Sequence, residues 1–389
     1  MFFIEKLKLG IIGIGNMGSA HAQNIISGKC PEIELCAVAD KNKKRLDWAK
    51  ETLPKTVKTF DSGEKMLDSG VINACIVAVP HYDHAYFAME CFKRNINVMV
   101  EKPAGVYTKQ VKEMNNASKK TKAVFAMMFN QRTNPLYIHM REMVKSGEMG
   151  KIKRVSWIIT DWYRTQSYYD SGDWRATWSG EGGGVLLNQC PHQLDLLQWI
   201  CGMPKTVLSK MHFGKWHDIE VEDDVTTYME FENGATGTFI TTTGDAPGTN
   251  RFEIDLEMGK LVCEDNKLKI WKSEINEREW VKTCKQGFEK PAYEYSEWEP
   301  KEESTQHIGV LNAFANNILH GGNLVANGEE GINGLTLSNA MHLSAFLEKQ
   351  ISLPFDEELY YKELMKRVKT SKRKTNVKEQ INSDMSGTF

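Results

Sequence analysis

Short apolar runs alternate with amphipathic segments through the first third of the chain. Strands are predicted over residues 7–13, 33–40, 71–80, 96–100 and 123–130, and helices over residues 16–26 and 82–94. Strands that alternate with helices form parallel sheets that are covered on both faces. The pattern therefore predicts an α/β domain of the Rossmann type over residues 1–130.

The pattern changes near residue 152, where strand candidates follow one another with turns such as Asn233-Gly234 between them. The predicted strands span 155–162, 226–232, 235–243, 252–257 and 260–263, and apolar residues at helical spacing predict helices over 185–200, 306–319 and 335–349. Residues 131–365 are therefore predicted to form an α+β domain, a mainly antiparallel sheet with helices packed on it. No low-complexity linker separates the two halves, so we expect a tight cleft between them.

The end of the chain is polar and gathers basic residues, namely Lys366, Arg367, Lys369, Lys372, Arg373, Lys374 and Lys378. Terminal runs of charge are usually solvated and seldom take a fixed structure. Residues 366–389 are therefore expected to form a poorly ordered basic tail. A contact with RNA or with a phosphate group is the alternative interpretation.

Composition and charge narrow the class of protein. A hydrophobic fraction of 41% and a charged fraction of 26% over 389 residues are ordinary for a globular chain of two domains. The formal net charge of -2 gives no reason to expect nucleic acid or an anionic membrane as a partner. Neither a secretion signal nor an apolar run of about 18 residues is present, and the eight cysteines form no CxxC pair. The sequence therefore predicts a cytoplasmic protein with a small-molecule partner.

A GxGxxG motif, formed by Gly13, Gly15 and Gly18, stands between the first strand and the first helix. In a dinucleotide fold these glycines allow the tight turn, the approach of the pyrophosphate and close helix–strand packing. Asp40 ends the second strand 22 residues after Gly18, where a carboxylate can bind the ribose hydroxyls and repel a 2′-phosphate. NAD is therefore predicted in preference to NADP, although the basic residues at 41–45 could accommodate a phosphate. A glycine-rich turn without a ligand is the alternative.

Further motifs follow in a fixed order. They are Val79-Pro80 with His84, Glu101-Lys102-Pro103, Asn130-Gln131-Arg132, Gly182-Gly183-Gly184, and an HxxD pattern at His192 and Asp195. With this series the chain resembles, over nearly its whole length, the Gfo/Idh/MocA family of oxidoreductases, the relatives of glucose-fructose oxidoreductase and inositol dehydrogenase.

The resemblance implies that NAD(H) or NADP(H) binds the first domain. It also implies that a large open-faced sheet in the second domain builds the substrate cleft and often the subunit interface, which favours a homodimer or homotetramer. The cofactor contacts expected on this basis are Gly13, Gly15, Asn16, Met17, Gly18, Asp40, Val79, Pro80, His84, Glu101, Lys102 and Gln131.

The resemblance also assigns catalytic roles to Lys102 and His192. It implies that His192 exchanges a proton with the substrate hydroxyl, a task that suits an ordinary histidine pKa of about 6.5. Lys102 would lie beside the nicotinamide, where burial and the positive ring should lower its pKa. Many members carry aspartate four residues before the histidine, whereas this chain has Asn188. Because asparagine brings no negative charge, lower pKa values are expected for both groups. A surface lysine and a core histidine are the alternatives.

Aromatic residues and arginines gather between residues 161 and 178. Aromatic faces can lie against the C–H faces of a sugar, and arginines can bind hydroxyls or a carboxylate. Core or interface packing is the alternative for each tryptophan. The substrate contacts predicted are Trp162, Arg164, Trp174, Arg175, Asn188 and Asp195. No metal is predicted, because His81 and His84 are the only close histidine pair and lie where the resemblance places cofactor contacts.

The sequence thus predicts an NAD-dependent oxidoreductase. It would transfer hydride between nicotinamide and a secondary alcohol of a sugar, glycoside or cyclitol, and Lys102 and His192 would handle the proton. Two alternatives stay open. One is a redox-neutral, NAD-dependent enzyme that cleaves glycosides by oxidation and elimination, and the other is a non-catalytic regulator that senses NAD.

Overall fold

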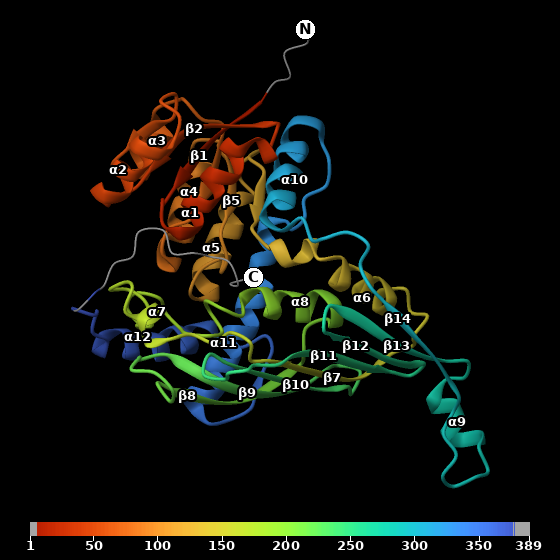
Figure 1. The fold of residues 1–389 in the computed structure, drawn as a ribbon. Helices are drawn as coiled ribbons and strands as arrows, with labels where there is room; N and C mark the ends of the chain where they lie inside the picture. Colours follow the sequence, from red (N-terminus) through yellow and green to blue (C-terminus); the bar gives the residue numbers. More distant parts are fainter. Residues whose placement is uncertain (1–5, 376, 378–389) are drawn as a thin grey trace.

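The first domain contains a parallel sheet with helices on both faces (Figure 1), in a computed structural model that describes residues 6–375 and 377. Its six strands lie in the order β3-β2-β1-β4-β5-β6. They are β1 (Leu7–Ile12), β2 (Ile33–Ala39), β3 (Lys58–Phe60), β4 (Ala74–Val77), β5 (Asn97–Val100) and β6 (Phe125–Met127). The predicted Rossmann-type domain is confirmed, and the three-residue edge strand β3 is the one strand of this sheet that the pattern missed; it also missed the helices over Lys43–Thr52, Gly63–Asp68 and Thr108–Ser118. The strand order reverses at β1, the position where such folds bind ligands.

Helices connect these strands and cover the sheet. They are α1 (Asn16–Asn24), α2 (Lys43–Thr52), α3 (Gly63–Asp68), α4 (His84–Lys93) and α5 (Thr108–Ser118), with a π-helical turn at Ile25–Lys29 and a short 3-10 turn at His81–Asp83. The strands β1 and β4 are buried along almost their whole length, as expected for a sheet with two covered faces. Their carboxyl ends therefore meet at one edge of the domain.

The second sheet has nine strands in the order β14-β13-β12-β11-β7-β10-β9-β8-β15. All neighbouring pairs are antiparallel except β10 with β7. The strands are β7 (Ile152–Ile159), β8 (Thr206–Phe213), β9 (Glu222–Glu230), β10 (Thr236–Thr242), β11 (Asn250–Leu256), β12 (Gly259–Glu264), β13 (Lys267–Ser273), β14 (Tyr293–Trp298) and β15 (Ile351–Ser352). The predicted mainly antiparallel sheet is confirmed, and the sequence pattern missed β8, β13, β14 and β15.

Helices cover the face of this sheet that turns toward the first domain (Figure 1). They are α6 (Pro135–Lys145), α8 (Pro191–Cys201), α11 (Gly331–Leu347) and α12 (Glu357–Thr370), while the short α7 (Gln166–Tyr169) lies in the loop after β7 and α9 (Glu277–Thr283) projects from the body. Helix α8 begins at Pro191, six residues after the predicted start. Proline suits the first helical turn, and the preceding N–H groups of Gly184 and Leu186 bond to the buried carboxylate of Glu222.

Helix α10 (Gln306–His320) lies on the first domain, although the sequence pattern placed it on the antiparallel sheet. Its apolar residues Val310 and Phe314 belong to the same buried core as Leu7 and Leu9 of β1. The prediction of its position was wrong because an apolar helical face does not identify the sheet that it will cover. The second half of the chain thus completes the core of the first domain.

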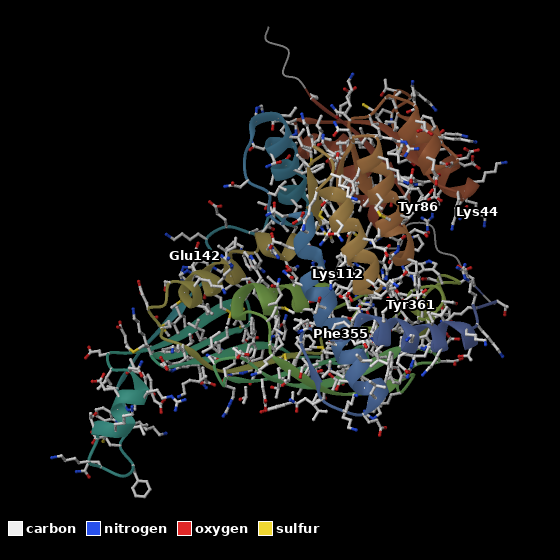
Figure 2. All side chains as sticks on the ribbon, turned by 180° about the vertical axis from the view of Figure 1, so that it is seen from behind. Lys44, Tyr86, Lys112, Glu142, Phe355 and Tyr361 are labelled. Atoms are coloured by element: carbon white, nitrogen blue, oxygen red, sulfur yellow. The ribbon has the colours of Figure 1, made fainter. Side chains whose placement is uncertain are left out.

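The expectation of a poorly ordered tail from residue 366 is wrong for residues 366–375. Helix α12 continues to Thr370, because Tyr360 and Leu364 are buried and the guanidinium of Arg367 lies over the Phe346 ring at 3.4 Å. Figure 2 places Tyr361 of α12 and Lys112 of α5 at the junction of the domains. Beyond the helix the Ser371 hydroxyl donates to Glu220, 2.5 Å away. Lys378 and the residues after it lie outside the described part of the chain.

Candidate active site

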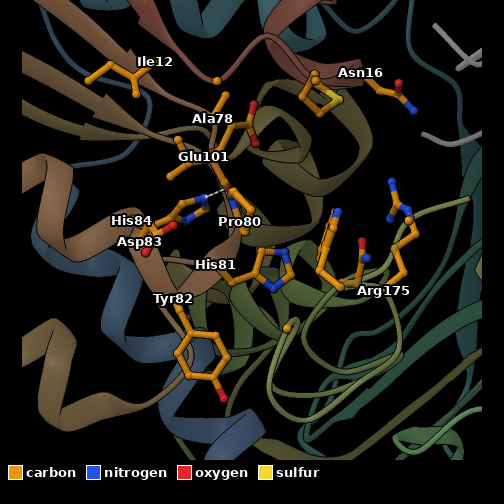
Figure 3. Close-up of a pocket in the computed structure, with 18 of the residues that line it drawn as sticks. Ile12, Asn16, Ala78, Pro80, His81, Tyr82, Asp83, His84, Glu101 and Arg175 are labelled. Carbon is orange, nitrogen blue, oxygen red and sulfur yellow. Dashed lines mark hydrogen bonds between the residues drawn. The ribbon is translucent and has the colours of Figure 1, made fainter. Parts of the chain in front are cut away.

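A cavity of about 1000 Å³ opens at the carboxyl ends of β1, β2 and β4 and extends between the two domains (Figure 3). It brings together the glycine turn, the Glu-Lys-Pro triplet and the residues that precede α8. The predicted site residues that line it are Gly13, Gly15, Asn16, Met17, Asp40, Val79, Pro80, His84, Glu101, Lys102, Gln131, Trp162, Arg164, Trp174, Arg175, Asn188 and His192. Two of the predicted residues, Gly18 and Asp195, do not line it.

The glycine turn has a geometry that fits a dinucleotide. Gly13 has a φ of +92°, and a Cβ there would overlap the carbonyl group of Ala78. A Cβ at Gly18 would overlap the carbonyl oxygen of Gly13, so this glycine serves helix–strand packing as expected. A Cβ at Gly15 would meet nothing within 4 Å, which leaves the backbone open to the cavity. The first turn of α1 carries no acidic side chain, and its free N–H groups suit a pyrophosphate.

Asp40 lies at the end of β2 and lines the cavity. Its Oδ2 accepts the N–H of Ile14 and its Oδ1 accepts the N–H of Asn42, each over 2.8 Å. The carboxylate therefore anchors the glycine turn, and each of its oxygens retains a further acceptor site for a hydroxyl. Its negative charge at this position fits the ribose of NAD better than a 2′-phosphate.

Glu101 and Lys102 follow β5 at the floor of the cavity. Glu101 is buried against His21, with 2.6 Å between its Oε1 and the ring Nε2. Although burial alone would raise the pKa of Glu101, the hydrogen bond and the charge of His21 lower it to about 2. No sequence motif pointed to His21, which lies 80 positions earlier on α1. The pair joins α1 to the segment after β5 that contains Lys102.

His84, one of the predicted cofactor contacts, bonds to the protein backbone through both of its ring nitrogens. Its Nδ1 lies 2.6 Å from the carbonyl oxygen of Pro103, and its Nε2 lies 2.7 Å from that of Val79. The ring thereby joins the loop after β4 to the loop after β5. Burial lowers the pKa of His84.

The amine of Lys102 points across the cavity and donates to the backbone carbonyl of Asn188 over 2.8 Å. Burial lowers the pKa of Lys102, and the nearby charges of Arg164 and Arg175 act in the same direction. Glu101 and Glu181 oppose this shift. A lowered pKa was expected for this lysine from its sequence context, and its surroundings act in that direction.

His192 occupies the first turn of α8 and is only 5% exposed. Neither of its ring nitrogens has a hydrogen-bond partner among the described residues. Burial and the charge of Lys102 hold the pKa of His192 well below its usual value. A buried neutral imidazole without partners, in the wall of a cavity, is therefore available to a ligand.

Asn188 is tied to a carboxylate that the sequence analysis missed. Its Nδ2 donates to Oε1 of Glu181 and to the hydroxyl of Tyr168. Glu181 is 2% exposed and also accepts the N–H of Ala176 over 2.6 Å. Burial raises the pKa of Glu181. The site thus retains a carboxylate next to position 188, and the only sequence signal for it was its place directly before the glycine run.

The aromatic segment divides between the cavity and the core. Trp162 and Trp174 line the cavity. Tyr169 and Trp178 do not, since the Tyr169 hydroxyl donates to Thr243 and the Trp178 ring packs in the core. Some aromatic residues of this segment therefore line the cavity, and others pack in the core.

The expected substrate contact of Asp195 is wrong. Its two oxygens accept Nε and Nη2 of Arg132, each over 2.7 Å, and its side chain is 1% exposed. Because Arg132 and Gln198 take up its oxygens, this carboxylate is not available to a ligand, and Asp195 does not line the cavity. The ion pair joins α8 to the 3-10 turn at Asn130–Thr133.

The cavity is also lined by residues that were not among the predicted cofactor and substrate contacts. They include His81, Tyr168, Gln189 and Gln193, and, from the segment after α12, Arg373 and Val377. Lys374 bonds to the carbonyl of Tyr169 over 2.9 Å, which holds this segment against the aromatic loop. Among residues 6–375 and 377, no group of three or more His, Cys, Asp or Glu side chains could hold a metal ion.

Comparisons with known proteins agree with this architecture. The myo-inositol 2-dehydrogenase of Thermotoga maritima is 24% identical over 361 residues, which are 90% of this chain and 99% of that protein. The scyllo-inositol 2-dehydrogenase (NAD(+)) of Bacillus subtilis is 24% identical and covers 60% of this chain and 66% of its own length. None of the helices in the described part of the chain is long and apolar enough to cross a membrane.

Solved structures share the fold. The WlbA dehydrogenase from Bordetella pertussis, in complex with NADH and UDP-GlcNAcA, superimposes with a TM-score of 0.77 at 24% identity, over 92% of this chain and 100% of that one. Levoglucosan dehydrogenase, in complex with NADH and levoglucosan, gives a TM-score of 0.74 at 19% identity, over 90% and 100% of the two chains.

Two family descriptions match most of the chain. Residues 7–129 match the oxidoreductase family with an NAD-binding Rossmann fold, and residues 137–262 match the GFO/IDH/MocA C-terminal domain. The predicted resemblance and the predicted NAD cofactor are confirmed. The chain belongs to the Gfo/Idh/MocA family of NAD-binding oxidoreductases.

Proposed function

We propose that this oxidoreductase transfers hydride between NAD and a secondary alcohol of a sugar, glycoside or cyclitol. The observation that carries the proposal is His192, a buried imidazole without partners, in the same cavity as Lys102 and the glycine turn. The names of several relatives, which are dehydrogenases of inositols and of a sugar derivative, support the substrate class.

His192 would act as the acid/base. Because its ring is neutral near pH 7, it can accept the proton of the substrate hydroxyl as the C–H bond breaks. Bound NAD would supply the acceptor for the hydride. Lys102 would donate a hydrogen bond to the same substrate oxygen and stabilise the negative charge that develops on it.

Asn188 would position Lys102 and would not exchange a proton. Its backbone carbonyl accepts the Lys102 amine, and its side-chain amide is held by Glu181 and Tyr168. The pyrophosphate and the ribose of NAD would be held by Gly13, Gly15, Asn16, Met17 and Asp40. Gly18 does not line the cavity and would allow the close packing that this turn needs.

The test compares the rates of the wild type, Lys102→Met and His192→Ala on a panel of sugars, cyclitols and glycosides. The rate is measured from the absorbance of the NADH that forms. Removal of a positioned acid/base costs about 100- to 10 000-fold in kcat. NADH binding should persist in both variants, and Lys120→Met, at an exposed lysine of the first domain, should behave as wild type.

The same assay separates the alternatives. Cleavage of a glycoside without net NADH release would replace the proposal with the redox-neutral reaction. Full biological activity of Lys102→Met would replace it with the NAD-sensing regulator.

We also propose a homodimer or homotetramer that forms through the face of the second sheet that carries no helix. Ile158, Leu208 and Tyr228 are exposed large apolar side chains on β7, β8 and β9, and Leu208 lies opposite Tyr228. A scattering measurement of molar mass tests this, because Tyr228→Glu should then shift the oligomer toward monomer.

A further inference from the structure

We propose that the substrate carries an anionic group, a carboxylate or a phosphate, and that Arg164 and Arg175 bind it. This inference rests on the proposed function and specifies its substrate class. It comes from the charges in the wall that the second domain contributes to the cavity.

Three arginines line that wall, Arg164, Arg175 and Arg373, against a single lining carboxylate, Asp173. Asp173 already pairs with Arg373, over 3.3 Å. Glu181 is close by but lies behind the wall, where Ala176 and Asn188 occupy its oxygens. The charge of Arg175 acts on Glu181 and that of Arg164 acts on Asp161, but neither guanidinium forms an ion pair with these carboxylates. Two guanidinium groups therefore face the cavity without an ion-pair partner.

Neither guanidinium satisfies its donors on a charged group. Arg164 donates to the carbonyl oxygens of Trp162 and Tyr163 over 3.4 and 2.9 Å, and its buried Nε has no partner. Arg175 donates to the hydroxyl of Tyr168 over 3.0 Å. Among the described residues no carboxylate pairs with either one. Guanidinium groups in partly buried positions are normally paired, so the missing partner points to a ligand.

The two arginines also form one unit. Their guanidinium carbons lie 5.3 and 4.7 Å from the centre of the Tyr168 ring, and Arg175 is 4.7 Å from the centre of the Trp174 ring as well. Contacts of this kind restrict a flexible side chain before a ligand arrives. A restrained guanidinium fork matches the two oxygens of a carboxylate or phosphate and exceeds what a neutral hydroxyl needs.

The test measures binding instead of turnover, so that it does not depend on the proposed chemistry. D-glucuronate, D-glucose 1-phosphate and D-glucose are titrated into the protein with NADH present, and the heat of binding is measured by isothermal titration calorimetry. The His192→Ala protein is titrated in parallel. We expect at least one anionic sugar to bind about tenfold tighter than D-glucose to both proteins, and the tighter of the two identifies the carboxylate or the phosphate as the natural group.

Arg164→Gln and Arg175→Gln should each reduce the anionic affinity by about tenfold or more and leave D-glucose binding unchanged. Arg175→Lys keeps the charge and should retain part of the preference, which controls for misfolding. Arg278→Gln, at an exposed arginine on α9, should change nothing. The proposal is overturned if D-glucose binds as tightly as both anions. It is also overturned if the two variants weaken NADH binding and leave the sugars unaffected, because the arginines would then serve the cofactor phosphates.

Discussion

Replacing Asn188 with aspartate, the residue that the family pattern led us to expect at this position, should destabilise this protein. In this chain the side-chain amide of Asn188 donates to the buried carboxylate of Glu181. Asn188→Asp removes the donor and brings two carboxylates into contact. The protein must then either keep both charges or hold a proton between them.

The loss of stability can be calculated for each of these two cases. Two full charges about 3 Å apart cost about 5 kcal/mol at an effective dielectric constant of about 20. Keeping one carboxyl protonated at pH 7.5, against an ordinary pKa of about 4.3, costs about 4 kcal/mol. Burial already raises the pKa of Glu181, which reduces this second cost. We therefore expect Asn188→Asp to lower the free energy of unfolding at pH 7.5 by about 2–4 kcal/mol.

The sign of the pH dependence is determined by the raised pKa of the pair. A group with a raised folded pKa contributes stability that is complete below its unfolded pKa and is lost as the pH rises. The penalty in Asn188→Asp should thus grow by up to about 1.4 kcal/mol for each pH unit above about 4.3. Urea unfolding at pH 5.5 and pH 7.5 should show a larger difference from wild type at the higher pH.

The exchange variant Glu181→Gln with Asn188→Asp provides the matched control. It restores one carboxylate and one amide in the same contact, so it should recover most of the stability and lose the added pH dependence. Equal stability of Asn188→Asp and wild type at pH 7.5, with no difference between the two pH values, would refute the contact with an ionised Glu181.

Three further outcomes follow from the site. Gly18→Ala should weaken NADH binding and cost about 1–3 kcal/mol of stability, since the new Cβ would overlap the Gly13 carbonyl; unchanged thermal unfolding and NADH titration would contradict this. Asp195→Asn should cost about 3 kcal/mol in urea unfolding, because it leaves the buried charge of Arg132 with Glu330 as its one ion-pair partner among the described residues, and should leave the KM for substrate nearly unchanged in whatever folded protein remains. Because burial and Lys102 lower the pKa of His192, kcat/KM should be the same at pH 6.5 and pH 7.5; a half-maximal point at or above pH 6.5 would count against His192 as the base.

The amino-acid sequence alone determined the order of the two domains, the glycine turn with Asp40, and the positions of Lys102 and His192. These features depend on residues that are close in the chain, since a strand, a tight turn and a helix start leave their pattern within about twenty positions. Where such a pattern ends at the carboxyl edge of a parallel sheet, the sheet itself brings the motifs together. The predicted site residues therefore gathered in one cavity, with two exceptions.

Only the tertiary structure decided the features that join distant parts of the chain. Arg132 and Asp195 are 63 positions apart, and the bond that joins His21 to Glu101 spans 80. The packing of α10 on the first sheet and the attachment of Lys374 to the aromatic loop join even more distant segments. Local periodicity does not predict such pairs. It can indicate that a side chain is buried and therefore needs a partner, but it does not indicate which distant residue that partner is.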